Sequence, residues 1–279
     1  MSAASGSATY SDDERAHLAY QYSDAEKLRV RIESHRRYSE RSGEFFDWVL
    51  PHIAPKRGLR LLDVGSGPGP YHPRLAAEGV RVVAVDQSHG MIREVLSQAR
   101  SAGYDATGAS ADASYLPFAA ASFERVMANH MLYYVKDQRA ALEGMRRVLR
   151  PGGRIILATN AADSGTELSE LHEAAARQLG YTPGARDASN FTLSDLSLVR
   201  SVFPSAVVHI REDAFVFPDA RSAIEYYASG MVDVLAPRVL DNSHREPLID
   251  AMRQQIEIIV ARDGVFRVAK NSGCFVATA

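Results

Sequence analysis

Short apolar runs alternate with helical stretches through the middle of the chain. Four runs have the length typical of buried strands, at residues 59–64, 80–85, 123–128 and 154–158, and a weaker one lies at 107–111. The stretches between them, 71–78, 88–102 and 137–149, predict helices. A β-α-β-α series of this kind predicts the α/β class, with a mostly parallel sheet and helices on both faces.

The N-terminal part of the chain predicts helices and no strand. Residues 11–14 and 23–26 each read Ser-Asp-x-Glu, which fits the capping box that begins many helices. A third apolar segment, 45–50, ends against Pro51. Residues 1–11 are small and polar and lack the basic start and apolar stretch of a signal peptide, so we expect a disordered tail there. Residues 12–57 are expected to form an N-terminal helical cap.

The pattern beyond residue 159 is mixed. Helices are predicted at 168–179, 193–202, 223–227 and 247–260, and a strand is predicted at 206–210. Two apolar runs, 265–269 and 274–277, flank Lys270-Asn271-Ser272-Gly273 and predict a terminal antiparallel hairpin at or near the sheet edge.

A glycine-rich turn separates the first predicted strand from the first helix of the series. In Asp63-Val64-Gly65-Ser66-Gly67-Pro68-Gly69-Pro70 the glycines alternate, which allows a tight turn and a close backbone approach to a ligand. A dinucleotide fingerprint instead needs G-x-G-x-x-G, so that pyrophosphate meets a helix N-terminus. In this chain Pro70 occupies the position where that helix would open towards a phosphate. The glycine-rich turn could therefore bind a cofactor other than a dinucleotide. The alternatives are a turn with a purely structural role and the dinucleotide site of an NAD-dependent oxidoreductase.

The turn resembles motif I of the class I S-adenosylmethionine-dependent methyltransferases, D/E-x-G-x-G-x-G. Asp86-Gln87-Ser88-His89-Gly90-Met91 is similar to the family's D-x-S-x-x-M, and residues 111–113 to its adenine-binding segment. Residues 147–153 are similar to its R-V-L-K/R-P-G-G turn. The resemblance covers residues 58–160 and is strongest to ubiquinone/menaquinone-biosynthesis-like enzymes, a small-molecule type that includes many natural-product methyltransferases.

The resemblance implies a fold and a cofactor. The fold is a Rossmann-like α/β sheet of seven mostly parallel strands, with helices on both faces and an antiparallel edge strand. Residues 58–279 would form the methyltransferase domain, with a helical insertion at about 218–263. The cofactor is S-adenosyl-L-methionine, and the product is S-adenosyl-L-homocysteine. The family pattern assigns cofactor contacts to Asp63, Gly65, Ser66, Gly67, Asp86, Gln87, Met91, Asp112, Ala113 and Asn129.

Within that set, the resemblance gives each residue a part. The glycine loop would pass beneath the methionine portion, with Asp63 orienting its ammonium group. Asp86 would accept hydrogen bonds from both ribose hydroxyls, and Asp112 would read the adenine edge. Asn129, at the end of the fourth strand, would lie near the methyl group.

The sequence after the fourth strand bears on the acceptor. Residues 129–134 read Asn-His-Met-Leu-Tyr-Tyr and lack the prolines of the N/D-P-P-Y/F/W motif found in nucleic-acid and protein amide N-methyltransferases. We therefore expect a small aromatic or heteroaromatic acceptor of bacterial secondary metabolism, with indole-type compounds among the candidates. A quinone precursor, or a non-catalytic S-adenosylmethionine-binding protein, is the alternative.

Several aromatic and histidine side chains are candidates for the chemistry. His130 is the candidate general base, because it follows Asn129 and histidine ordinarily titrates near neutrality. Packing or capping is its alternative role. Tyr22 and Tyr133 are further catalytic candidates. Aromatic faces can pack on a flat acceptor and attract a sulfonium, which makes acceptor-contact candidates of Tyr20, His35, Tyr38, Tyr134 and Tyr226.

Composition narrows the partners. The net charge of −2 gives no broad attraction to nucleic acid or anionic membrane, and no apolar run approaches the ~20 residues that span a bilayer. Cys274 is the single cysteine, which excludes internal disulfides and fits a reducing cytoplasm. The remaining histidines show no ligand spacing, so no metal is expected. We expect a cytoplasmic monomer or homodimer acting on a small molecule.

Overall fold

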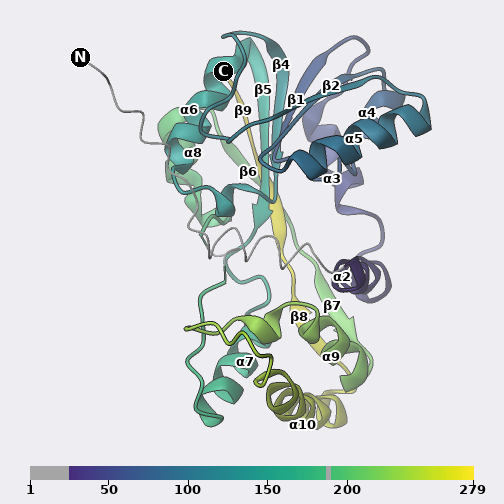
Figure 1. The fold of residues 1–279 in the computed structure, drawn as a ribbon, viewed down its shortest axis with the longest axis vertical. Coiled ribbons are helices and arrows are strands. Elements are labelled where there is room, and N and C mark those ends of the chain that lie inside the picture. Colours follow the sequence, from purple (N-terminus) through teal and green to yellow (C-terminus); the bar gives the residue numbers. More distant parts are fainter. Residues whose placement is uncertain (1–24, 187–189) are drawn as a thin grey trace. The chain divides into compact units, whose positions relative to one another are not determined.

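The computed structural model describes residues 25–186 and 190–279. Contacts within the chain divide it into two compact units (Figure 1). The sheet unit consists of Ser42–Ser164, Asp187–Glu212 and Asn271–Ala279. The helical unit consists of the segments up to Arg41, Gly165–Arg186 and Asp213–Lys270.

The sheet unit is built on a seven-stranded sheet of order β3-β2-β1-β4-β5-β9-β6. Its strand β9 is antiparallel to both neighbours, β5 and β6, and the other strand pairs are parallel. The predicted fold class is therefore confirmed, with the antiparallel strand one place in from the edge strand β6. The strands are β1 (Arg60–Val64), β2 (Arg81–Asp86), β3 (Ala106–Ser110), β4 (Phe123–Asn129), β5 (Leu149–Asn160), β6 (Val207–Arg211) and β9 (Ser272–Thr278).

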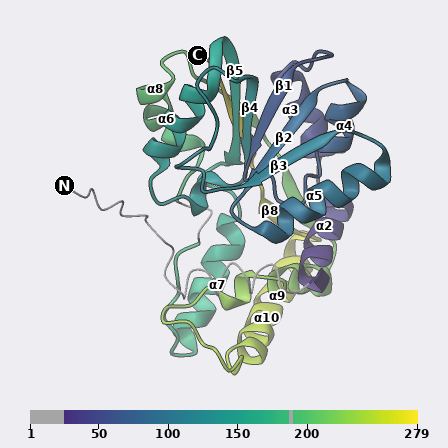
Figure 2. The same ribbon diagram turned by 45° about the horizontal axis from the view of Figure 1, so that its top comes forward.

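Helices cover both faces of this sheet because side chains along each strand alternate between the faces (Figures 1 and 2). Leu61 packs with α3 and α4, whereas Leu62 belongs to the cluster that includes residues of α6 and α8. The helices of this unit are α3 (Phe45–Ile53), α4 (His72–Ala77), α5 (His89–Ala102), η1 (Leu132–Tyr134), α6 (Gln138–Val148), η3 (Leu193–Asp195) and α8 (Leu196–Val202).

The third N-terminal segment is longer than expected and packs in the sheet unit. Helix α3 continues through Pro51 to Ile53, because Val49 and Ile53 are buried against the sheet. It was predicted to end at Pro51 and to share a cap with the preceding helices. The second of those helices is confirmed as α2 (Ala25–Tyr38), whereas the predicted tail and the capping box at 11–14 lie outside the described residues.

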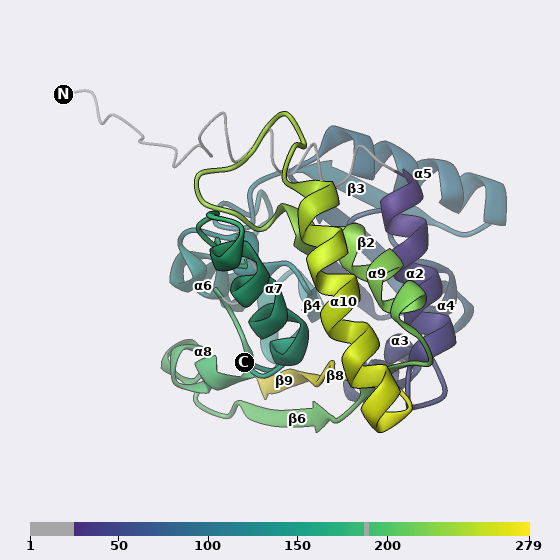
Figure 3. The same cartoon turned by 90° about the horizontal axis from the view of Figure 1, so that it is seen from below.

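The helical unit has a core of its own. Helices α7, α9 and α10 lie side by side in Figure 3, and around them Phe217, Tyr227 and Met252 are fully buried. The unit comprises α2, α7 (Thr166–Gln178), β7 (Ala214–Phe217), α9 (Ala220–Ala228), η4 (Met231–Asp233), α10 (Arg245–Asp263) and β8 (Phe266–Ala269). It therefore contains more than the predicted insertion at about 218–263. Among the described residues, no helix is long and apolar enough to cross a membrane.

The predicted C-terminal hairpin is wrong. Strand β8 pairs with β7, a strand that the sequence analysis missed, and β9 instead inserts between β5 and β6. Of the four residues interpreted as the turn, Lys270 and Asn271 separate β8 from β9, and Ser272 and Gly273 already belong to β9. Gly273 lies within β9, where a Cβ would stand 2.1 Å from the backbone oxygen of His209. It is therefore a strand residue that permits close approach of β6.

Candidate active site

The predicted cofactor residues gather where the parallel strands β1, β2, β3 and β4 end. Asp63 is paired in register with Ala84 of β2 and Met127 of β4, and Asp86 with Ser110 of β3. In open α/β sheets, ligands bind outside this carboxyl edge. The topology thus brings the glycine loop and the ends of the neighbouring strands to one place.

The loop after β1 is shaped by its glycines. Gly65 and Gly67 have φ angles of 66° and 53°, in the left-handed region that side chains disfavour. The N–H groups of Gly65 and Ser66 both donate to the backbone oxygen of Val85, at 2.7 and 3.0 Å. A Cβ on Gly65 would lie 2.7 Å from the Met131 side chain, whereas a Cβ on Gly67 would meet nothing within 4 Å. The loop is tight at Gly65 and open at Gly67.

Asp86, at the end of β2, organises both the glycine loop and the start of α5. Its Oδ2 accepts from the Gly67 N–H at 2.9 Å, and its Oδ1 accepts from the Ser88 N–H at 2.8 Å. Ser88 in turn caps α5 by accepting from the N–H of Met91. Each carboxylate oxygen has a second lone pair, so Asp86 can still accept hydroxyl hydrogen bonds.

The predicted adenine segment forms a compact turn after β3. Asp112 accepts from the Ser114 N–H at 2.8 Å through its Oδ1, and Ala113 is buried. Gln87 is exposed, and its backbone oxygen accepts from the Ser110 hydroxyl at 3.0 Å. These hydrogen bonds fix the backbone of the segment that is predicted to bind adenine. Adenine binding by this segment stays a prediction.

Asn129, which ends β4, has an unsatisfied amide. Its Nδ2 and Oδ1 atoms are both buried and have no hydrogen-bond partner among the described residues. A buried polar group left unpaired costs about 1–3 kcal/mol, so such groups are rare without a reason. An amide of this kind at the carboxyl edge of the sheet is suited to a polar ligand that supplies both a donor and an acceptor.

His130 is held in a strained backbone conformation. Its φ is 53°, and its N–H donates to the backbone oxygen of Ala158 at 2.8 Å. The Phe45 ring lies edge-on with its centroid 5.2 Å from that of the imidazole. Burial lowers the pKa of His130 to about 4, so the ring is neutral at pH 7. The expectation that it titrates near neutrality is wrong, because desolvation disfavours the imidazolium.

Asp63 forms a buried pair that the sequence analysis missed. Its Oδ2 lies 2.8 Å from Nε2 of His72, the first residue of α4, and the two side chains are 2% and 0% exposed. Burial raises the pKa of Asp63, and the hydrogen bond from His72 opposes that shift. His72 carries no motif of its own. Its proximity to Asp63 depends on how the loop and α4 fold back.

The other candidates fall into separate groups. Tyr133 and Tyr134 lie together on η1 in the sheet unit, with ring centroids 4.5 Å apart. His35, Tyr38 and Tyr226 share one aromatic cluster in the helical unit, where Phe215 and Phe217 are its buried members. Tyr20 and Tyr22 lie outside the described residues.

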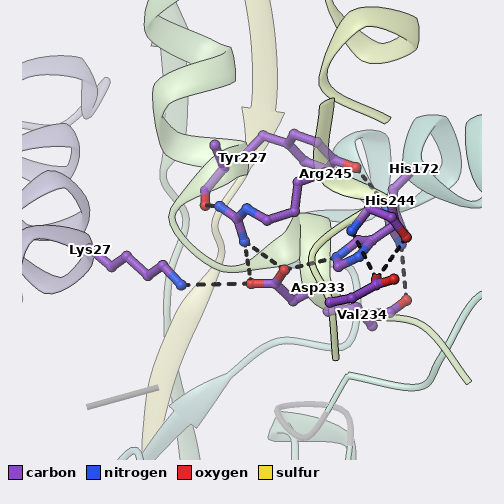
Figure 4. Close-up of polar contacts among 10 residues, drawn as sticks. Lys27, His172, Tyr227, Asp233, Val234, His244 and Arg245 are labelled. Atoms are coloured by element: carbon purple, nitrogen blue, oxygen red, sulfur yellow. Dashed lines mark hydrogen bonds and ion pairs between the residues drawn. The ribbon is translucent and has the colours of Figure 1, made fainter. Parts of the chain in front are cut away.

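A polar network crosses the helical unit (Figure 4). Asp233 of η4 accepts from Arg245 at 2.6 Å and lies 3.0 Å from His244, while Lys27 stands 3.9 Å away. His172 of α7 lies 2.8 Å from the Tyr227 hydroxyl and 3.0 Å from the backbone oxygen of Val234. These contacts join α2, α7, α9, η4 and α10, which indicates a structural role. In the described part of the chain, no group of three or more His, Cys, Asp or Glu is placed to hold a metal.

Residues 62–157 match the family model described as "Methyltransferase domain". The chain is 42% identical over 106 residues to a demethylmenaquinone methyltransferase of Clavibacter sepedonicus. The aligned region covers 38% of this chain and 42% of that protein. The chain is also 29% identical over 193 residues to a malonyl-[acyl-carrier protein] O-methyltransferase of Erwinia pyrifoliae, covering 68% and 69%. The chain thus spans less than half the length of the first of these relatives.

The fold is also found in solved structures. Haemonchus contortus phosphoethanolamine N-methyltransferase 2, solved with S-adenosyl-L-methionine, is similar with a TM-score of 0.59 and 20% identity, covering 97% of this chain and 60% of that one. The strand order, the glycine loop and these matches define a methyltransferase fold. Residues 62–157 are the part of the chain that matches the methyltransferase family model, and their strand order is that of the similar solved structures.

Proposed function

We propose that the protein transfers the methyl group of S-adenosylmethionine to a small aromatic or heteroaromatic metabolite. The observation that carries the proposal is the buried amide of Asn129, whose two polar atoms have no partner among the described residues. It ends β4, beside the glycine loop that follows β1. The unsatisfied amide and the open space at Gly67 fit a cofactor with polar groups lying across this edge.

Different residues of the chain bind different parts of the cofactor. Gly65, Ser66 and Gly67 present backbone to the methionine portion, and Asp63 accepts from its ammonium group. Asp86 accepts from the ribose hydroxyls while it holds Gly67 in place. Gln87, Met91, Asp112 and Ala113 surround the adenine. Asn129 completes the site with an amide donor and acceptor that have no partner among the described residues.

The cofactor supplies an already activated methyl group, so the protein mainly aligns the acceptor and excludes water. Holding the reacting atoms about 3–3.5 Å apart and in line can lower the barrier by about 7–11 kcal/mol. His130 is neutral at pH 7 and accepts a hydrogen bond or a proton from the acceptor, with its ring held by Phe45. A base with a pKa of about 4 is weak, which favours an orienting role.

The aromatic side chains support a flat acceptor. Phe45 lies beside His130 in space, and Tyr133 and Tyr134 follow it closely in sequence, all within the sheet unit. The demethylmenaquinone methyltransferase that the chain resembles favours a quinone precursor as the second candidate acceptor. In either case the acceptor is a small molecule.

The proposal is tested by incubating the protein with S-adenosylmethionine and a panel of indoles, phenols and demethylated quinones. Release of S-adenosylhomocysteine together with a methylated product supports it, and the product identifies the acceptor class. Tight cofactor binding without turnover on any member of the panel would favour the non-catalytic alternative.

A further inference from the structure

We propose that His72 is a positioning residue for the cofactor's amino-acid end. It holds one oxygen of Asp63, and so leaves the other to accept from the ammonium group in a fixed orientation. The inference rests on the part given to Asp63 in the proposed function. His72, which lies outside the glycine motif, is thereby added to the residues that bind the cofactor.

The first support is the geometry of the pair. Nε2 of His72 lies 2.8 Å from Oδ2 of Asp63, and both side chains are buried. No hydrogen bond reaches Oδ1 of Asp63 from any described residue, so one oxygen is fixed and the other is available. A carboxylate with one anchored oxygen has lost most of its rotational freedom before a ligand arrives.

The second support is the fit between His72 and the glycine loop. A Cβ on Gly69 would lie 2.5 Å from Nδ1 of His72, and the His72 N–H donates to the backbone oxygen of Gly69 at 3.0 Å. The third glycine of the loop therefore makes room for the imidazole, which couples the ring's position to the loop's path. Gly69 also has a φ of 74°, which a side chain would resist.

The third support is the cost of the arrangement. Nδ1 of His72 is buried and has no partner among the described residues, so donation from Nε2 leaves an unsatisfied acceptor on the same ring. Buried ionisable pairs are often no more stabilising than apolar residues of similar volume. This arrangement is costly for folding and lies next to the glycine loop, so ligand binding explains it better than stability does.

Removing His72 also changes the charge state of Asp63. Burial raises the pKa of Asp63, and the hydrogen bond from His72 opposes that shift. Without His72, the carboxyl group is protonated more readily and loses its attraction for an ammonium group. The effect of the substitution should therefore be confined to ligands that carry the amino group.

The test measures the affinity for two ligands by calorimetry: S-adenosylhomocysteine, and its analogue with hydrogen in place of the α-amino group. His72→Leu should weaken the first about tenfold, as expected for loss of a charge-assisted contact, and change the second less than about twofold. His72→Gln, which restores an N–H donor near Nε2, should recover most of the affinity. Equal weakening of both ligands would show a merely structural role and overturn the inference.

Two controls separate the possible failures. His172→Leu removes another buried, hydrogen-bonded histidine in the helical unit, and should leave the ratio of the two affinities unchanged. Asp63→Asn should abolish the preference for the amino group. If Asp63→Asn does so and His72→Leu does not, the inference about His72 fails alone. If neither changes the ratio, the proposed part of Asp63 fails as well.

Discussion

Asp86 Oδ2 accepts a hydrogen bond from the Gly67 N–H at 2.9 Å, so the carboxylate that ends β2 holds the loop that follows β1. Two sequence motifs that are separate along the chain thus form one structural unit. A change at either residue should affect the other's contacts with the cofactor.

Asp86→Ala should weaken binding of S-adenosylmethionine by roughly ten- to a hundredfold, because it removes charge-assisted acceptors worth about 1.5–3 kcal/mol. Calorimetric titration measures the affinity, and circular dichroism checks that the protein is folded. Asp86→Asn keeps one acceptor oxygen and should lose less. An unchanged affinity in Asp86→Ala would remove this residue from the site.

Gly67→Val should abolish cofactor binding with only a modest loss of stability. The φ of 53° makes a β-branched residue costly by about 1–3 kcal/mol, and the side chain would occupy the open space that the cofactor needs. Gly103→Val is the matched control, since Gly103 has a φ of 72°, equally open surroundings and a position at the end of α5. If both variants bind the cofactor normally, the loop is only a turn.

Asn129→Leu should separate stability from function. The buried amide has no partner in the described part of the chain, so an apolar side chain of similar size should hold or raise the free energy of unfolding, by up to about 1–3 kcal/mol. The same change should weaken cofactor binding or slow turnover. Denaturant unfolding and titration give the two quantities. A destabilised variant with normal binding would mean that the amide serves the fold.

The pH profile should report the unusual environment of His130. Its pKa is lowered to about 4, so the neutral form predominates above pH 4 and is lost only as the pH falls through that value. Turnover should therefore show no limb from this group between pH 6 and 8, in contrast to an ordinary histidine. An acidic limb near pH 6.5 that disappears in His130→Ala would contradict this.

His130→Ala itself distinguishes two roles. If the imidazole removes a proton in the transition state, turnover should fall by ~10²–10⁴-fold with cofactor affinity nearly unchanged. If it only orients the acceptor, the Michaelis constant should rise and turnover fall modestly. Wild-type kinetics in this variant would eliminate both roles and leave the histidine as a packing residue beside Phe45.

The parts of the molecule that the sequence predicted well are those fixed by local patterns. Strands β1 to β5 follow short apolar runs, and the residues at their carboxyl ends follow from parallel pairing. The hairpin failed because the partner of β8 is β7, earlier in the chain, and because Gly273 is set by contact with His209 rather than by a turn. Pairings of this kind depend on distant residues that no local pattern records.

The same division holds at the site. The glycine loop and Asp86 are recognised by their order along the chain, whereas His72 is important only through the pair it makes with Asp63. The pKa of His130 depends on burial, which its neighbours in sequence do not reveal. The contact between Phe45 and His130 joins two distant segments, and for that reason Phe45 was not among the predicted aromatic candidates.

We propose that this chain moves a methyl group from S-adenosylmethionine to a small acceptor. The most direct measurement follows an isotopically labelled methyl group from the cofactor by mass spectrometry, with the acceptor panel and wild-type protein. Appearance of the label in an aromatic or heteroaromatic product, matched by S-adenosylhomocysteine and lost in Gly67→Val, is the predicted result. Bound cofactor with no label in any small molecule of the panel would contradict the claim.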